Sequence, residues 1–251
     1  MNSPKSSQDS IIFGTRPIIE ALKLGKEIDK ILIQQGLLGE QVQEIKMLLK
    51  DSGTAIQYVP GQKLDSITRK NHQGVIAYIA PITYSRIENL LPELFERGVE
   101  PMVLVLDRVT DVRNFGAIVR TAECAGVHAI VIPQAGAARI NEDAVKTSAG
   151  ALFNIPICKE ANLKYTIAFL QASGLQVVAC TEKTKTEIYD IDLNRPTAIL
   201  MGSEEDGISP ALLKVADSLA AIPLAGKTGS LNVSVAAGVI LYEALRQRKS
   251  A

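Results

Sequence analysis

Polar side chains gather in three turns of the sequence, and each turn follows a short apolar run. Residues 107–120 hold two Asp, three Arg and one Asn around the start of a predicted helix. Residues 202–209 place three consecutive acidic residues between two glycines, and residues 222–236 form a Gly-, Ser- and Thr-containing loop that enters a run of small residues. Because α/β proteins bind ligands beyond the carboxyl ends of parallel strands, we expect the three turns to converge on one ligand site.

Each turn also has an ordinary structural interpretation. Asn114 stands where a helix N-cap is typical, and so does either Ser230 or Asn232. Arg120 lies in an otherwise apolar helical stretch and could equally be a solvated surface residue. Helix capping does not explain three consecutive acids beside two glycines, which permit close backbone approach or a positive φ.

Several familiar catalytic patterns are absent from the sequence. The phosphate-binding loop needs Gly-x-x-x-x-Gly-Lys-Ser/Thr, and its first glycine would fall at Ala221, ahead of the segment 226–228. No Gly-x-Gly-x-x-Gly follows a predicted strand, and no Gly-x-Ser-x-Gly is present. The two histidines, His72 and His128, fall in different predicted domains, which argues against a His-based metal site or a Ser-His-Asp triad.

The composition is that of an ordinary soluble globular protein. The 251 residues carry a formal net charge of zero and are 47% hydrophobic, which excludes general disorder. Three dispersed cysteines do not make a disulfide framework, so we expect a reducing, cytoplasmic compartment. The longest apolar stretch, residues 233–242, is too short to span a bilayer. Zero net charge still permits a local basic patch that binds nucleic acid.

The apolar periodicity predicts two α/β domains. We expect a flexible tail at 1–10, a small α/β domain at 11–80, a linker at 81–100 that includes a charged helix-like stretch, and a larger α/β domain at 101–251. Short apolar strands separated by helices predict a mostly parallel sheet in the larger domain. Its predicted strands are 102–106, 129–132, 175–179 and 197–201, and its predicted helices are 115–125, 163–172 and 233–248. In the smaller domain the predicted strands are 28–34, 55–59 and 74–79, with helices beginning at a Thr15 cap and spanning 38–50.

Taken in order, the three turns resemble the motifs of the SpoU (TrmH-type) RNA 2′-O-ribose methyltransferases of the knotted SPOUT class. The family's first motif, Asn-x-Gly-x-x-x-Arg, is matched by Asn114, Gly116 and Arg120. The second, Gly-x-Glu-x-x-Gly, is matched by Gly202, Glu204 and Gly207. The third, Ile-Pro-Met followed by Ser-Leu-Asn-Val-Ser-Val-Ala, is matched by Ile222, Pro223 and residues 230–236, with Leu224 in place of Met. Val112 also stands where Pro often precedes Arg-Asn.

The predicted first domain resembles the L30e-like RNA-binding domain of the same family. The stretches 12–22 and 72–77 carry this resemblance. The two-domain layout is similar to that of the bacterial methylases of a 23S rRNA guanosine. The resemblance implies an RNA partner, a C-terminal trefoil knot and a homodimer formed through the knot region.

The resemblance also implies the reaction: transfer of a methyl group from S-adenosylmethionine to a ribose 2′-hydroxyl, without a metal. It implies as catalytic residues Arg120, Asn114, Glu204, Asn232 and Ser230. It implies as donor-binding residues Thr181, Met201, Gly202, Ile222, Leu224 and Leu231. The candidates for RNA contact are Arg16, Arg69, Lys70, His72, Arg108, Arg113 and Arg139. For Arg120 we expect it to hold a substrate phosphate and stabilise the developing alkoxide, because a guanidinium stays protonated.

The sequence leaves three alternatives open. The substrate could be a tRNA, the protein could be a non-catalytic RNA-binding homologue, or it could be a small-molecule α/β enzyme that uses another nucleotide. The intact motif residues Asn114, Arg120, Glu204 and Asn232 count against the non-catalytic alternative.

Overall fold

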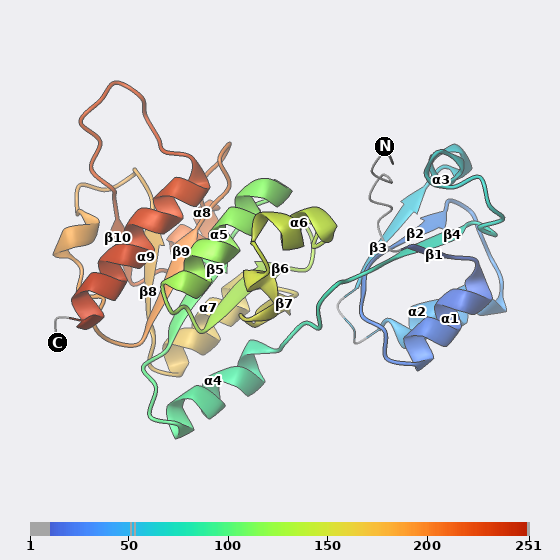
Figure 1. Cartoon of the computed structure of the whole chain (residues 1–251), viewed down its shortest axis with the longest axis horizontal. Coiled ribbons are helices and arrows are strands. Elements are labelled where there is room, and N and C mark those ends of the chain that lie inside the picture. The colour runs from blue at the N-terminus through green and yellow to red at the C-terminus, as the bar shows by residue number, and fades with distance from the viewer. Residues whose placement is uncertain (1–10, 51, 53, 250–251) are drawn as a thin grey trace, which may run out of the picture. The chain divides into compact units, whose positions relative to one another are not determined.

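A computed structural model describes residues 11–50, 52 and 54–249. The chain forms two compact units (Figure 1): the first comprises the described residues up to 83 together with 140–142, and the second comprises residues 84–139 and those from 143 onward. The tail predicted for residues 1–10 lies outside the described residues. Among the residues that are described, no helix combines the length and apolar character needed to cross a membrane.

The first unit is a four-stranded sheet in the order β1-β4-β2-β3. β4 pairs antiparallel with β1 and β2, and β2 pairs parallel with β3. The strands are β1 (Ile11–Phe13), β2 (Ile28–Gln34), β3 (Ala55–Val59) and β4 (Val75–Ile79), and the helices are α1 (Thr15–Lys23), α2 (Glu40–Leu48) and α3 (Gly61–Ile67). Its main core joins apolar residues of β2 and β4 to those of α1 and α2. The strands predicted at 28–34, 55–59 and 74–79 are all found.

Thr15 does not cap α1 as predicted. The N-cap is Gly14, whose φ of 90° favours glycine, and Thr15 is the first helical residue. The Thr15 N–H donates instead to Gln73 Oε1 at 3.1 Å, and the Thr15 hydroxyl donates to Gln41 Oε1 of α2. The helix start is therefore tied to the turn before β4 rather than capped locally.

The second unit is a six-stranded sheet in the order β10-β8-β9-β5-β6-β7, with every pair parallel. The strands are β5 (Met102–Leu106), β6 (Ala129–Pro133), β7 (Ile157–Glu160), β8 (Gln176–Cys180), β9 (Thr197–Met201) and β10 (Ser218–Ala220). The helices are α4 (Ile87–Glu96), α5 (Val112–Cys124), α6 (Glu142–Thr147), α7 (Leu163–Ala172), α8 (Pro210–Leu213) and α9 (Val233–Lys249), with short 3₁₀ turns at Ala151–Phe153 and Ile188–Asp190. The predicted α/β class with a parallel sheet is confirmed.

The central strands β5 and β9 are aliphatic along their whole length apart from Thr197, and all their residues are buried. Such continuous apolar runs are typical of parallel strands covered on both faces. α5 and α9 lie side by side (Figure 1) and pack together, while α7 packs against α8. The sheet order therefore places the carboxyl ends of β10, β8, β9 and β5 next to one another along one edge.

Part of the stretch 81–100 belongs to the second unit. Ile87 and Leu91 of α4 are 1% exposed and pack in the same core as β5 and β8. The N-terminus of α4 is held at the sheet because the Ile87 N–H donates to Glu160 Oε1 of β7 at 3.4 Å. The apolar periodicity of the sequence does not predict β1, α3, α6, β7 or β10, which are short and contain few apolar positions.

Candidate active site

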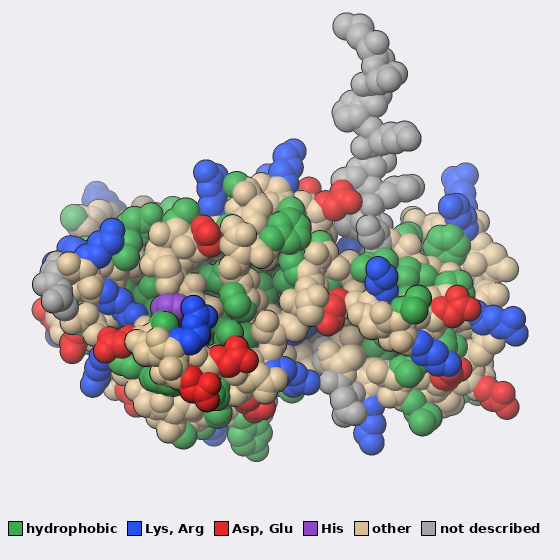
Figure 2. Space-filling view, turned by 60° about the horizontal axis from the view of Figure 1, so that its bottom comes forward, with side chains coloured by type: hydrophobic (Ala, Val, Ile, Leu, Met, Phe, Trp, Pro, Cys, Tyr) green, Lys and Arg blue, Asp and Glu red, His purple; other side chains and the backbone are tan. Residues whose placement is uncertain are grey.

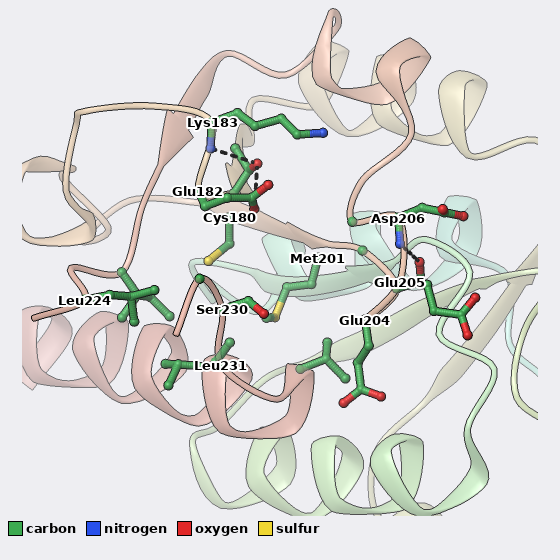
Figure 3. A pocket seen from close by; sticks show the side chains of 18 residues that line it. Cys180, Glu182, Lys183, Met201, Glu204, Glu205, Asp206, Leu224, Ser230 and Leu231 are labelled. Carbon is green, nitrogen blue, oxygen red and sulfur yellow. Dashed lines mark hydrogen bonds between the residues drawn. The ribbon is translucent and has the colours of Figure 1, made fainter. Parts of the chain in front are cut away.

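A cavity of about 420 Å³ opens at the carboxyl ends of β8 and β9. Its walls come from the turn after β8, the turn after β9 and the loop between β10 and α9 (Figure 3). We call it the first cavity. Met201, Ile222, Leu224 and Leu231 give it apolar surface, and the opposite wall is acidic.

A second cavity of about 340 Å³ adjoins it, beyond the carboxyl end of β5. Arg108, Asp111 and Asn114 line this second cavity but not the first. Both cavities share Val233 and the residues 203–206 as lining. The turn after β9 is therefore a wall between two neighbouring pockets.

A cluster of three polar side chains lies where the cavities meet. The Asn232 side-chain amide donates to Asn114 Oδ1 at 3.1 Å and also to Glu204 Oε1. The Asn232 Oδ1 accepts from the Ser234 N–H at 2.9 Å, so Asn232 also caps α9. One residue of each turn thus contributes to a single hydrogen-bonded group.

The N-cap of α5 is Asp111 and not Asn114. Asp111 Oδ1 accepts from the Asn114 N–H at 2.7 Å. Because Asp111 satisfies the helix start, the Asn114 side chain is left to face the second cavity. The prediction that Asn114 is the N-cap of this helix is therefore wrong.

Arg108 is held in place by three acceptors. It donates to Asp206 Oδ2 at 3.0 Å, to the Gly207 carbonyl at 3.2 Å and to Asp107 Oδ1 at 3.3 Å. The other oxygen of the buried Asp107 accepts from the Ser209 N–H at 2.7 Å. Arg108 has a φ of 57°, an uncommon backbone conformation for a side-chain-bearing residue. Its guanidinium joins the turn after β5 to the turn after β9.

The turn after β9 closes very tightly. An added Cβ at Gly202 would lie 2.0 Å from the Gly207 carbonyl carbon. Gly207 itself has a φ of 68°, in the left-handed region that favours glycine. These two glycines give the wall between the cavities its shape.

The turn after β8 contributes Cys180, Thr181 and Lys183 to the first cavity. Burial and, to a smaller extent, the nearby Glu182 carboxylate raise the pKa of the Cys180 thiol to about 11, so the thiol is neutral and not a nucleophile at neutral pH. Thr181 is 8% exposed, and its N–H donates to the Ala220 carbonyl of β10 at 2.9 Å.

All of the donor-binding candidates lie along the first cavity. Thr181, Met201, Gly202, Ile222, Leu224 and Leu231 line it, as do Glu204 and Ser230. The cavity lining also includes Cys180, Lys183 and Asp206, which were not predicted as site residues. Cys180 and Lys183 flank the predicted Thr181 at the end of a predicted strand, which is the signal that could have identified them.

Among the catalytic candidates, Arg120 neither lines one of the two cavities nor belongs to the Asn114–Asn232–Glu204 cluster. It is exposed on α5, and no interaction of its guanidinium is found among the described residues. Asn114 and Arg120 are six residues apart, which on an α-helix is a rotation of about 240°. Within one chain the two side chains therefore leave α5 in different directions.

The remaining candidates for RNA contact are spread over both units. Arg16, Arg69, Lys70 and Arg113 are exposed, and Lys70 lies over the Phe13 ring at 5.5 Å. His72 is tied into its turn, because its Nδ1 accepts from the Gly74 N–H and its Nε2 lies 3.0 Å from Asp65 Oδ1. Arg139 is half-buried. On the face seen in Figure 2, Lys and Arg side chains are interspersed with Asp and Glu.

The described part of the chain holds no group of three or more His, Cys, Asp or Glu side chains arranged to bind a metal ion.

Comparison with known proteins gives two family matches. Residues 101–242 match the SpoU rRNA Methylase family, and residues 11–85 match the family described as RNA 2′-O ribose methyltransferase substrate binding. A Bacillus subtilis protein named for the TrmH family of tRNA/rRNA methyltransferases is 35% identical over 243 residues, which cover 97% of this chain and 98% of the relative. A similarly named Staphylococcus aureus protein is 35% identical over 241 residues, which cover 96% of this chain and 97% of that one.

Solved structures agree with these matches. An AdoMet-bound rRNA methyltransferase from Sinorhizobium meliloti has a TM-score of 0.60 and 31% identity, covering 94% of this chain and 86% of that one. The SpoU methyltransferase AviRb from Streptomyces viridochromogenes, in complex with the cofactor AdoMet, has a TM-score of 0.61 and 27% identity, covering 96% and 91%. Each of the two structural units is matched by a family, and the relatives match along nearly the whole chain. The protein belongs to the SpoU rRNA methylase family and is an RNA methyltransferase.

Proposed function

We propose that this protein transfers the methyl group of S-adenosylmethionine to a ribose 2′-hydroxyl of RNA, at a guanosine of 23S rRNA. The observation that carries the proposal is the pair of adjoining cavities with the Asn114–Asn232–Glu204 cluster at their junction. Donor and acceptor would enter from the two sides of one wall. Such placement holds the reacting atoms close together and can contribute up to about 7–11 kcal/mol to the reduction of a barrier.

The first cavity suits the proposed donor. Apolar side chains of Ile222, Leu224 and Leu231 would pack against the adenine, and the acidic wall at 204–206 would attract a positively charged sulfonium and ammonium. When bound, the sulfonium supplies a methyl group whose leaving group is a neutral thioether. No residue of the chain then needs to act as a nucleophile, in accord with the neutral Cys180 thiol.

The polar cluster would orient the acceptor ribose from the second cavity. Asn114 presents its side chain there, Asn232 fixes the Asn114 oxygen, and Glu204 fixes the Asn232 amide. Ser230 would complete the polar wall on the donor side. Hydrogen bonds of this kind restrict the ribose to the orientations in which the 2′-oxygen is aligned with the methyl group.

Arg120 would reach the site from a second copy of the chain. Its exposure on α5 and its absence from both cavities of its own chain support this arrangement. The protein would then be a homodimer formed through the proposed knot region around α9, with the Arg120 guanidinium on a substrate phosphate and on the developing alkoxide. The proton of the 2′-hydroxyl would leave to phosphate or to water.

The first unit would hold the RNA, and we expect the protein to act in the cytoplasm. Arg16, Arg69 and Lys70 supply exposed positive charge there, and Arg113 supplies it on α5. Arg108 and His72, by contrast, are already engaged by other residues of the chain, so their role would be to shape the surface.

The decisive experiment is methyl transfer from labelled S-adenosylmethionine to unmodified rRNA and tRNA from a deletion strain, followed by mapping of the modified nucleotide. We expect 2′-O-methylguanosine in 23S rRNA. The Arg120→Ala variant should lose transfer while its calorimetric affinity for S-adenosylmethionine stays within about twofold, because this residue lies outside the donor cavity. Label in tRNA alone, or in no RNA at all, would contradict the rRNA assignment.

A further inference from the structure

The first cavity contains a single positively charged side chain among the residues that the structure describes along its lining. Glu182, Glu204, Glu205 and Asp206 carry carboxylates in that lining, and Lys183 carries the ammonium. A ligand that carries both signs of charge would find complementary groups on two different walls. An acidic wall by itself would not bind a carboxylate.

Lys183 is positioned by its backbone rather than by its ammonium. Its N–H donates to the hydroxyl of Thr181 at 3.3 Å, and Thr181 is buried and fixed to β10. Its side chain is exposed and makes no ion pair with any described residue. In Figure 3 the side chain leaves the turn after β8 and points toward the wall that carries Asp206. The ammonium is therefore available to a ligand in the cavity mouth.

We propose that Lys183 binds the α-carboxylate of the amino-acid end of the methyl donor, and so selects donors that carry this end intact. The proposal rests on the function proposed above, which puts the donor in the first cavity. The acidic wall would take the sulfonium and the α-ammonium, while Lys183 would take the one negative group of the same molecule. The acidic wall at 204–206 and the Lys183 ammonium on the turn after β8, next to Glu182, would then bind groups of opposite charge and fix the direction in which the donor lies.

Ligand truncation tests this assignment. S-adenosylhomocysteine keeps the amino-acid end, whereas 5′-methylthioadenosine keeps the adenosine and the thioether but lacks the carboxylate. Both can be titrated calorimetrically into the full chain, with no turnover required. Lys183→Met removes the charge and keeps a long apolar side chain, and Lys185→Met is the matched control, because Lys185 is exposed on the same turn but does not line the cavity.

We expect Lys183→Met to raise the Kd of S-adenosylhomocysteine about five- to tenfold, since the pair is charge-assisted but partly solvated. The Kd of methylthioadenosine should stay within about twofold in the same variant. Lys185→Met should change neither value, and Lys183→Arg should recover most of the lost affinity. A loss of affinity for S-adenosylhomocysteine but not for methylthioadenosine in Lys183→Met would show that Lys183 binds the α-carboxylate of the amino-acid end.

Other outcomes overturn the proposal in identifiable ways. Equal weakening of both ligands by Lys183→Met would make the residue a support for the turn only. Unchanged binding of both, with a raised KM for RNA, would assign the lysine to the RNA. A Ser230→Trp variant, which places bulk on the exposed loop at the cavity wall, should weaken both ligands; if it weakens neither, the donor does not lie in the first cavity and the proposed function itself fails at this point.

Discussion

The side-chain amide of Asn232 donates to the side-chain oxygen of Asn114 at 3.1 Å, although 118 residues separate them along the chain. Asn114 lies in the first turn of α5 and Asn232 immediately precedes α9, and these two helices pack side by side. The contact joins the two cavities, because Asn114 lines the second and Glu204, the other partner of Asn232, lines both.

Asn232 has two functions that can be separated by one substitution. Asn232→Ser keeps a side-chain oxygen that can cap α9 but removes the amide that donates to Asn114 and Glu204, without adding charge beside Glu204. We expect methyl transfer to fall roughly ten- to a hundredfold, in line with the loss of a hydrogen bond to a charged group, while the melting temperature stays nearly unchanged. Initial rates and thermal denaturation measure the two effects.

Ser234→Ala is the control, because Ser234 also contacts Asn232 but not Glu204. A parallel loss of rate and stability in Asn232→Ser would contradict the separation.

Gly202 should tolerate no side chain. In Gly202→Ala the new Cβ would lie 2.0 Å from the backbone of Gly207, so the turn after β9 must open. We expect a loss of about 3 kcal/mol or more in the free energy of unfolding, together with loss of donor binding. Urea denaturation and calorimetry provide the measurements. Gly226→Ala is the matched control, since nothing lies within 4 Å of its Cβ position. Equal free energies of unfolding and equal donor affinities in the two variants would show that the turn after β9 can open without cost.

The proposed dimer makes a prediction about mixed subunits. Asn114→Ala and Arg120→Ala should each be inactive alone. If Arg120 acts on the site of the other chain, a mixed dimer of the two variants contains one site with both residues intact. Random exchange of equal amounts should then restore about a quarter of the wild-type rate, because half of the dimers are mixed and each has one working site. Recovery is measured after co-refolding or co-expression; if the mixture remains inactive although the subunits exchange, Arg120 acts within its own chain.

Ionisation of the Glu160 carboxyl should lower the free energy of unfolding as the pH rises. Burial raises the pKa of this carboxyl above its ordinary value of 4.5, against the opposing effects of the Ile87 N–H and the Arg86 charge. The folded chain therefore binds more protons than the unfolded chain between the two pKa values, and the free energy of unfolding falls as the pH rises through that window. Glu160→Gln keeps an oxygen for the Ile87 N–H and removes the titration. We expect its denaturation midpoint to vary less than that of the wild type from pH 4 to pH 8, and a steeper dependence in the variant would contradict the assignment.

RNA binding by the first unit should depend on salt through Arg69 and Lys70. Both are exposed, and each neutralised phosphate contact adds about one to the slope of log K against log salt concentration. Arg69→Gln with Lys70→Gln should lower that slope by about 1 to 2 for rRNA fragments in a filter-binding titration. The control is Lys23→Gln with Lys26→Gln, which removes equal charge, Lys23 being already paired with Glu44 at 2.7 Å. Equal changes in both double variants would indicate diffuse attraction rather than contacts at 69 and 70.

Four of the six strands of the second unit, β5, β6, β8 and β9, could be predicted from the sequence, as could the residue types of the three turns. Short, nearly continuous apolar runs such as Met102–Leu106 and Thr197–Met201 are typical of strands in a parallel sheet that is covered on both faces. These strands could therefore be predicted without tertiary information. The same holds for the motif residues, whose types and spacing are properties of the chain. The short elements β7, β10 and α6 were not predictable in this way, since their stability comes from the neighbours that they join.

The contacts of the polar side chains in these turns depend on how the strands are ordered in the folded sheet. The order β10-β8-β9-β5 brings four strand ends together and so converts turns far apart in sequence into neighbouring walls. That arrangement ties Arg108 to Asp206, joins Asn232 to Asn114, and leaves Arg120 outside both cavities of its own chain. The physical reason is that secondary structure follows from the periodicity of a local stretch, whereas a side chain's partner depends on which strands become neighbours in the sheet.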